Sequence, residues 1–112
     1  MRGETLKGHL DLLLLATVGD GALHGYAVVE ELRRRSDGAF DLPEGTVYPA
    51  LHRLEAAGLL ASEWSASSGR RRRVYRLTTR GGTALATRDD EWRRFAGAVT
   101  NVVEGGGCPN PA

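Results

Sequence analysis

Apolar residues recur at helical spacing in three stretches of the first half of the chain. The stretch 9–18, HLDLLLLATV, is apolar on nearly every side, whereas residues 25–36 and 43–57 each carry one apolar stripe. Such spacing predicts three helices. A helix that is apolar all round must be covered on both sides, so we expect part of the cover over residues 9–18 to come from a second chain.

The third predicted helix has two clearly different faces. The apolar face consists of Val47, Ala50, Leu51 and Leu54. The opposite face has little apolar bulk and several hydrogen-bond donors, and it consists of Gly45, Pro49, His52 and Arg53, flanked by Thr46 and Tyr48. Because Pro49 lacks an N–H and crowds the carbonyl four residues before it, we expect a slight kink and a slim outward surface.

Alternation replaces helical spacing after residue 58. Residues 61–66 and 71–77 read as two strands joined around SASSGR, a hairpin with a loop of more than two residues. Between the first two helices, residues 19–25, GDGALHG, are expected to form a turn, because their glycines allow unusual backbone angles.

A long last helix is predicted behind the hairpin, with Thr78 or Thr79 as its cap. Within it Leu85, Trp92 and Val99 lie seven residues apart, as in a coiled-coil seam. The order of elements predicts a mainly α fold with a small β-hairpin, a winged helix-turn-helix followed by a long dimerisation helix. We expect a DNA-binding domain over 1–78, a C-terminal dimerisation helix over 79–103 and a disordered tail over 104–112.

Charge is unevenly distributed along the 112 residues, a length that suits one domain. The formal net charge is only +1, but the stretch from residue 70 to residue 80 contains six arginines and no acid. Four of them are consecutive: Arg70, Arg71, Arg72 and Arg73. A basic hairpin directly after a helix with a donor-rich face indicates a protein that binds nucleic acid.

Other classes of protein receive little support from the sequence. Cys108 is the single cysteine, which excludes an internal disulfide and favours the reducing cytoplasm. The apolar run 12–18 is too short for a membrane span. The three histidines lie on separate predicted elements and no catalytic motif is visible, so we expect no enzyme activity, no cofactor and no metal site. His24 is expected to cap or pack at the entry to the second helix.

In a helix-turn-helix, the second helix enters the major groove of double-stranded DNA. In this chain we expect that helix to be the one over 43–57. The arginine run fits the tip of a wing that contacts phosphates or the minor groove. Tyr48 and His52 could instead be solvated or pack under the hairpin, and Tyr26 could pack against the third helix. The candidate DNA-binding residues are Tyr26, Thr46, Tyr48, Pro49, His52, Arg53, Arg70, Arg71, Arg72 and Arg73.

Four stretches occur in the order LDLLLLATV, LHGYAVVEEL, GTVYPALHRLEAAGLL and GRRRRVYRLTTRG. In this order they resemble the PadR family of bacterial transcriptional regulators, and in particular its short subfamily, over about residues 6–103. The resemblance implies a homodimer that represses transcription at a pseudo-palindromic operator and releases DNA when a small ligand binds. There are two departures: Leu42 stands where such proteins often have a capping serine, and Gly82 weakens the start of the last helix.

The resemblance also implies a ligand site on the last helix, since some relatives hold flat aromatic molecules between paired tryptophans at the position of Trp92. A small planar or cationic ligand would then contact Leu85, Arg88, Asp89, Trp92 and Phe95. Alternatively, Trp92 packs only in the dimer interface, for which the candidates are Leu12, Leu15, Leu85, Trp92 and Val99. Two other functions stay open: a ligand-independent regulator or activator, and a winged helix that binds proteins. The arginine run argues against the latter.

Overall fold

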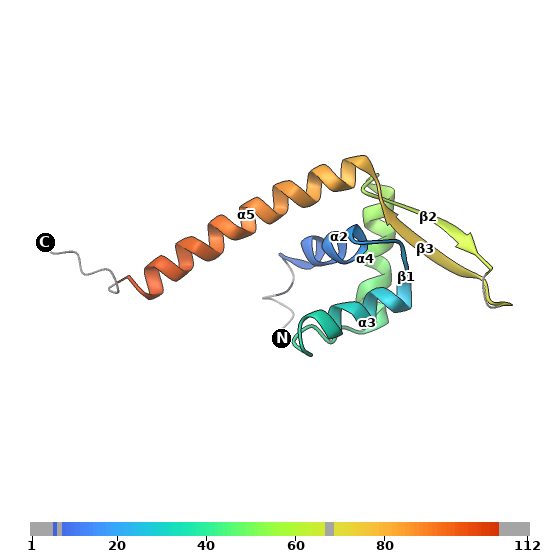
Figure 1. The fold of residues 1–112 in the computed structure, drawn as a ribbon, viewed down its shortest axis with the longest axis horizontal. Coiled ribbons are helices and arrows are strands. Elements are labelled where there is room, and N and C mark those ends of the chain that lie inside the picture. Colours follow the sequence, from blue (N-terminus) through green and yellow to red (C-terminus); the bar gives the residue numbers. More distant parts are fainter. Residues whose placement is uncertain (1–5, 7, 67–68, 106–112) are drawn as a thin grey trace, which may run out of the picture.

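A computed structural model describes residues 6, 8–66 and 69–105. Its helices are α2 (Leu10–Gly19), α3 (Gly25–Arg35), α4 (Glu44–Ala56) and α5 (Thr79–Val103), and its strands are β1 (Leu23–His24), β2 (Leu60–Ser65) and β3 (Arg72–Leu77). The first three of these helices gather beside the sheet, and α5 runs away from them (Figure 1). The molecule is therefore elongated, 67 × 28 × 21 Å. The predicted mainly α fold with a hairpin is confirmed; the predicted tail beyond residue 105 lies outside the described residues.

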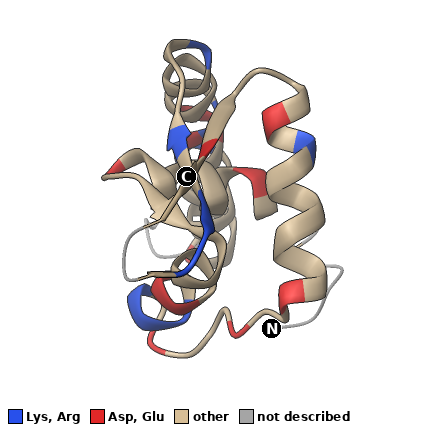
Figure 2. Cartoon of the chain, turned by 90° about the vertical axis from the view of Figure 1, so that its right-hand side faces the viewer, with Lys and Arg blue, Asp and Glu red and all other residues tan. Residues whose placement is uncertain are grey.

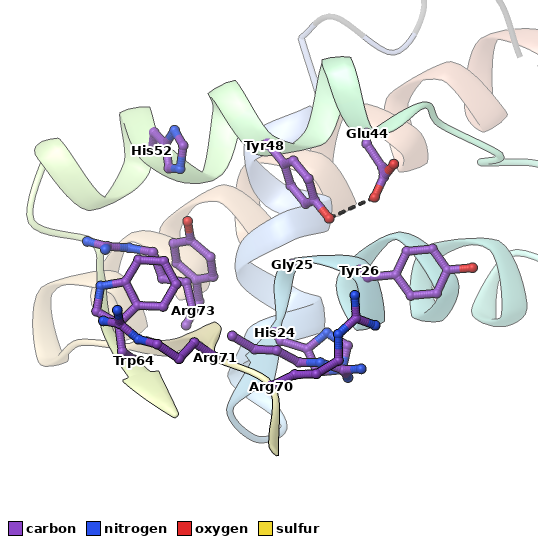
Figure 3. A pocket seen from close by; sticks show the side chains of 12 residues that line it. His24, Gly25, Tyr26, Glu44, Tyr48, His52, Trp64, Arg70, Arg71 and Arg73 are labelled. Atoms are coloured by element: carbon purple, nitrogen blue, oxygen red, sulfur yellow. Dashed lines mark hydrogen bonds between the residues drawn. The ribbon is translucent and has the colours of Figure 1, made fainter. Parts of the chain in front are cut away.

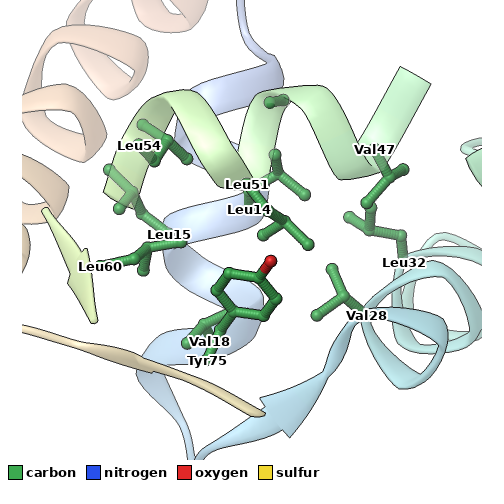
Figure 4. Close-up of a cluster of buried hydrophobic side chains, with 11 residues drawn as sticks. Leu14, Leu15, Val18, Val28, Leu32, Val47, Leu51, Leu54, Leu60 and Tyr75 are labelled. Carbon is green, nitrogen blue, oxygen red and sulfur yellow. The ribbon is translucent and has the colours of Figure 1, made fainter. Parts of the chain in front are cut away.

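Helix α2 lies at the centre of the fold and contacts α3, α4, α5 and β3 of its own chain. Leu14 and Leu15 have no exposed surface, and they meet Leu51 of α4 and Tyr75 of β3 in one apolar core (Figure 4). The expectation that a second chain covers α2 is therefore wrong for the residues that the chain itself buries, Leu14, Leu15, Thr17 and Val18. It is also wrong for Leu15 as a dimerisation residue, because the side chain is already enclosed by its own chain.

The sheet has three strands in the order β1-β3-β2, one strand more than the sequence predicted. Strands β2 and β3 form the expected antiparallel hairpin, with Leu60 opposite Leu77 and Ser65 opposite Arg72. Part of the predicted turn over 19–25 instead pairs with β3, Leu23 opposite Tyr75. Two residues make a strand only because β3 offers its free edge, so local sequence did not reveal it.

Capping side chains near each N-terminus fix where two of the helices begin. The His24 ring accepts a hydrogen bond from the N–H of Ala27 and caps α3, and Thr78 caps α5 by accepting from Gly81. Helix α4 begins at Glu44, and its N-cap residue is Pro43, which gives no side-chain cap. The sequence predicted a missing cap at Leu42, one residue earlier. The apolar face of this helix is buried, as expected: Val47, Ala50, Leu51 and Leu54.

Helix α5 is packed at its beginning and bare at its end. Leu85 lies against the core near Gly19, so it contributes to packing within the chain. Further along, the helix leaves the rest of the molecule (Figure 1) and exposes Trp92, Phe95, Val99, Val102 and Val103. Val102 and Val103 are 81% and 78% exposed. Among the described residues, no helix is both long and apolar enough to cross a membrane.

Candidate nucleic-acid interface

A groove of about 630 Å³ lies between α4, the start of α3 and the hairpin. Figure 3 shows its side chains converging from these elements. Aromatic rings and guanidinium groups dominate the lining, which consists of His24, Gly25, Tyr26, Glu44, Tyr48, His52, Trp64, Arg70, Arg71, Arg72, Arg73 and Tyr75. Residues predicted separately from three parts of the sequence therefore lie around one concave surface.

Tyr48 connects α4 with the start of α3. Its hydroxyl donates to Glu44 at 2.8 Å, and its ring lies so close to Gly25 that an added Cβ there would be 2.5 Å from the ring. Burial, followed by the bond to Glu44, raises the pKa of Tyr48 to about 12. The side chain is half-buried and stays neutral at physiological pH, so it offers the groove an uncharged phenol.

The start of α3 forms the lower wall of the groove. Tyr26 points outward with 53% of its surface exposed (Figure 3), and a hydrogen bond to Glu30 raises the pKa of its phenol. Nη1 of Arg72 lies 2.9 Å from Nε2 of His24. Desolvation, followed by the charge of Arg72, lowers the pKa of His24 and keeps the ring neutral. His24 can therefore cap α3 while a cation lies beside it.

The arginine run follows the hairpin into β3 (Figure 2). Arg70, Arg71 and Arg72 are exposed, whereas Arg73 is half-buried. Nη2 of Arg73 lies 3.4 Å from Oε2 of Glu55 on α4. Among the described residues, its Nε is a buried donor without a hydrogen-bond partner. Arg73 thus differs from the other three arginines, because it links the hairpin to α4.

Trp64 is a groove residue that the sequence analysis did not single out. It is 56% exposed, and the guanidinium carbons of Arg71 and Arg73 lie 4.7 and 5.4 Å from its ring centroid. The sequence did contain a signal for this contact, because one predicted strand of the hairpin has an aromatic residue and the other is rich in arginine. The register that makes Trp64 the partner of Arg73 was needed to identify the contact.

Three candidates on α4 lie apart from this groove. Thr46 and Pro49 are exposed on α4 but do not line the groove. Arg53 makes two hydrogen bonds to Asp11 of α2, at 2.6 and 3.1 Å. Its guanidinium is therefore held toward α2, which the helical wheel alone could not show.

Asp11 joins three helices. Besides Arg53 of α4, it faces Arg88 of α5 at 3.7 Å. The hydrogen bond from Arg53 is the main reason that the pKa of Asp11 is lowered, against an opposing effect of burial. One carboxylate thus ties the central helix to α4 and to the long last helix.

A second cavity, of about 210 Å³, lies where α5 passes the start of α2. Three predicted ligand contacts line it, Arg88, Trp92 and Phe95, together with Leu12 and His9. The rings of His9 and Trp92 meet edge to face at 5.1 Å. Leu85 and Asp89 are not part of the lining; Leu85 packs on the core and Asp89 pairs with Arg93 at 3.0 Å. Among the described residues, no cluster of side chains is suited to hold a metal ion.

The part of the chain that matches known proteins includes the groove residues and the start of α5. Residues 14–87 match the Transcriptional regulator PadR-like family. The chain is 42% identical over 103 residues to Transcriptional regulator Rv3488 of Mycobacterium tuberculosis, covering 92% of this chain and 90% of the relative. A PadR family transcription regulator from Clostridium difficile has a similar structure, with a TM-score of 0.75, 33% identity and coverage of 86% and 99%. A regulator of the same family from Eggerthella lenta gives a TM-score of 0.77, 33% identity and coverage of 90% and 87%.

Proposed function

Since the chain belongs to the PadR-like family of transcriptional regulators, which are non-enzymatic DNA-binding proteins, we propose that it is a homodimeric repressor of the cytoplasm. It binds double-stranded DNA at a pseudo-palindromic operator and leaves the operator when a small ligand binds. The observation that carries the proposal is the groove, which brings Tyr48 and His52 of α4 together with the start of α3 and the arginine run.

The proposed contacts divide between base edges and phosphates. The exposed face of α4, with Thr46, Pro49 and His52, enters the major groove and reads base edges. Tyr26 and Tyr48 lie beside the start of α3, where free N–H groups favour phosphate. Arg70, Arg71 and Arg72 contact the DNA backbone or an adjacent minor groove.

Arg53 and Arg73 take a different part in this proposal. Each is held by a carboxylate of its own chain, Asp11 and Glu55 respectively. A guanidinium that already makes an ion pair must give up part of it to reach a phosphate. We therefore assign both residues mainly to the placement of α4 and the hairpin.

The second copy is proposed to cover the bare end of α5. Large apolar side chains exposed along one helix, such as Trp92, Phe95 and Val99, mark an interaction surface. A two-fold axis brings the same stripe of the partner against it. The two α4 helices then face half-sites about 34 Å apart, or a multiple of that distance, on one side of the duplex.

The proposed ligand site is the cavity beside Trp92. In a dimer the cavity occurs twice, and Trp92 and Phe95 offer flat apolar surfaces to a planar molecule. A ligand there acts only if it prefers an arrangement of the two α5 helices that spaces the α4 helices wrongly for DNA. Quenching of Trp92 fluorescence by planar cationic dyes is expected in a Trp64→Phe variant, whose remaining tryptophan is Trp92. An unchanged spectrum at saturating dye contradicts this site.

A gel-shift and sedimentation experiment tests the function. The protein is incubated with duplexes from the DNA upstream of its own gene and with a scrambled duplex, at low salt and at about 0.5 M salt. We expect a dimer that prefers the upstream DNA and loses affinity steeply with salt, because released counterions drive binding. A chain that sediments as a monomer at micromolar concentration and ignores every duplex overturns the proposal. If the protein binds the upstream DNA and no added ligand weakens that binding, the result favours a ligand-independent regulator.

A further inference from the structure

Trp64 stands out because a large ring on an exposed hairpin needs a physical reason. It lies on β2, one of the two edge strands of the sheet, and 56% of its surface is exposed. In the strand register it is directly opposite Arg73. Arg71 lies just before the start of β3, and its guanidinium also lies over the Trp64 ring. The ring thus has two guanidinium groups within stacking distance, at 4.7 and 5.4 Å.

The two arginines differ in what else they contact. Arg73 continues from the indole to Glu55 of α4, and Glu55 also accepts a hydrogen bond from Ser62 at 2.6 Å. Arg71 is exposed, and among the described residues no carboxylate pairs with it. A stacked guanidinium keeps its N–H groups free at the edge of its plane. Arg71 can therefore stack on Trp64 and still donate to a phosphate.

We propose that Trp64 is a positioning residue for DNA binding, which rests on the function proposed above. Its indole holds Arg71 in place beside the groove (Figure 3). Through Arg73, which pairs with Glu55, it also fixes the hairpin relative to α4. The hairpin and α4 then meet one duplex as a single rigid surface. The ring itself acts through arginine and does not read bases.

The physical advantage is that the arginine is ordered before DNA arrives. A free arginine side chain loses rotamer entropy when it binds a phosphate, and a stack in the unbound protein removes part of that loss. A stack at an exposed site is worth about a two- to fivefold change in affinity. Loss of the phosphate contact itself lowers the slope of log K against log salt by about 0.9.

The test measures affinity for one duplex over a series of salt concentrations. Trp64→Phe keeps an aromatic face, whereas Trp64→Leu keeps apolar bulk and loses that face. We expect Trp64→Leu to weaken binding about fivefold and to reduce the salt slope, and Trp64→Phe to stay within about twofold of the wild type. Arg71→Ala is compared with Arg76→Ala, which removes the same charge from the opposite face of β3. The loss of affinity for DNA should be larger for Arg71→Ala than for Arg76→Ala.

A double-mutant cycle shows whether Trp64 acts through Arg71. In an Arg71→Ala background, Trp64→Leu is expected to weaken binding clearly less than in the wild type, because only the route through Arg73 remains. Arg71→Lys leaves the ring untouched, and it should keep the salt slope while weakening binding about threefold, because lysine has charge but no flat face.

The outcomes separate this inference from the proposed function. If the wild type binds no duplex, the proposed function fails and the inference fails with it. If the wild type and Arg76→Ala bind while Trp64→Leu or Arg71→Lys binds as the wild type does, the function stands and the inference is overturned. Equal losses from Trp64→Leu with and without Arg71 overturn it as well.

Discussion

At the residue scale, two adjacent glycines at the start of α5 have opposite requirements. Gly81 is buried, and a Cβ built on it would lie 2.0 Å from the carbonyl oxygen of Leu59. Gly82 has open space around it, and its nearest atom is Cδ2 of Leu77 at 4.0 Å. The first glycine is needed for the close approach of helix and strand. The second costs helix stability and provides no contact in return.

Alanine substitutions at these two positions should therefore change stability in opposite directions. We expect Gly81→Ala to lower the free energy of unfolding by about 2–3 kcal/mol, because backbone atoms must move apart. Gly82→Ala should raise it by about 0.5–1 kcal/mol through helix propensity. Urea denaturation of the three proteins measures both. A Gly81→Ala protein as stable as the wild type would contradict the close packing of α5 on Leu59.

Residue chemistry also predicts two kinds of loss in DNA binding. Replacing Arg71, Arg72 and Arg73 by alanine should weaken binding to all duplexes, with a smaller salt slope, because phosphates are the same in every sequence. Replacing Thr46 or His52 by alanine should change which bases are preferred at one position, by about 1–3 kcal/mol. Binding to a set of single-base operator variants measures the difference. The same loss on every duplex for both groups would show that this division is wrong.

At the scale of elements, Asp11 is the residue that fixes α4 relative to its neighbours. Its carboxylate receives Arg53 of α4 at 2.6 Å and faces Arg88 of α5 at 3.7 Å. The Arg53 side chain is mostly exposed and that of Arg88 is half-buried, while the carboxylate is mostly covered. Asp11 therefore connects α5 with α4 by its side chain, in addition to the contacts of the core.

The variant Asp11→Asn should lower the free energy of unfolding by about 1–2 kcal/mol at pH 7, since a charge-assisted pair is lost. Because the folded pKa of Asp11 lies below its ordinary 3.8, the pair stabilises the protein above that value and is lost as pH falls through the folded pKa. The difference in the free energy of unfolding between wild type and variant should thus disappear as the pH falls below about 4. Denaturation curves at several pH values measure it.

Asp90→Asn is the matched control for this change. Asp90 also pairs with an arginine, Arg94 at 3.0 Å, but both side chains are more than half exposed. A surface pair of this kind contributes little, so we expect a loss below about 0.5 kcal/mol. Similar losses for the two variants would argue that Asp11 has no special place between the helices.

At the scale of the whole molecule, the chain is a compact core with a long helix whose end is bare. The core is built by side chains of α2, α3, α4 and the sheet. The far half of α5 leaves large apolar side chains exposed. The homodimer proposed above would cover this stripe, because large exposed apolar side chains mark an interaction surface.

A charge placed on the apolar stripe should dissociate the proposed dimer. We expect Val99→Asp to raise the dimer dissociation constant at least about tenfold, because an unpaired carboxylate is costly to bury. Asn101→Asp adds the same charge about 200° around the helix and should leave dissociation nearly unchanged. Sedimentation equilibrium over a range of concentrations measures both. Equal constants for the two variants would place the interface elsewhere.

The sequence by itself determined everything that depends on local spacing and local chemistry. Helical periodicity marked the buried face of α4, from Val47 to Leu54, and the pair Thr78 and Thr79 marked the start of α5 to within one residue. These features were predictable because caps, turns and side-chain faces depend on residues three or four apart. The arginine run, and the resemblance of the chain to a known family, were likewise recognised from short stretches of sequence.

Only the tertiary structure decided which surfaces meet. It enclosed Leu15 within its own chain, gave Leu23 a strand partner on β3, turned Arg53 toward Asp11 and set Trp64 against the arginines. In each case the partner lies far away in the sequence, and periodicity says which face is apolar or charged but not what will cover it. Contacts of that kind follow from how the elements pack together, and that is why the groove and its positioning residues emerged only with the fold.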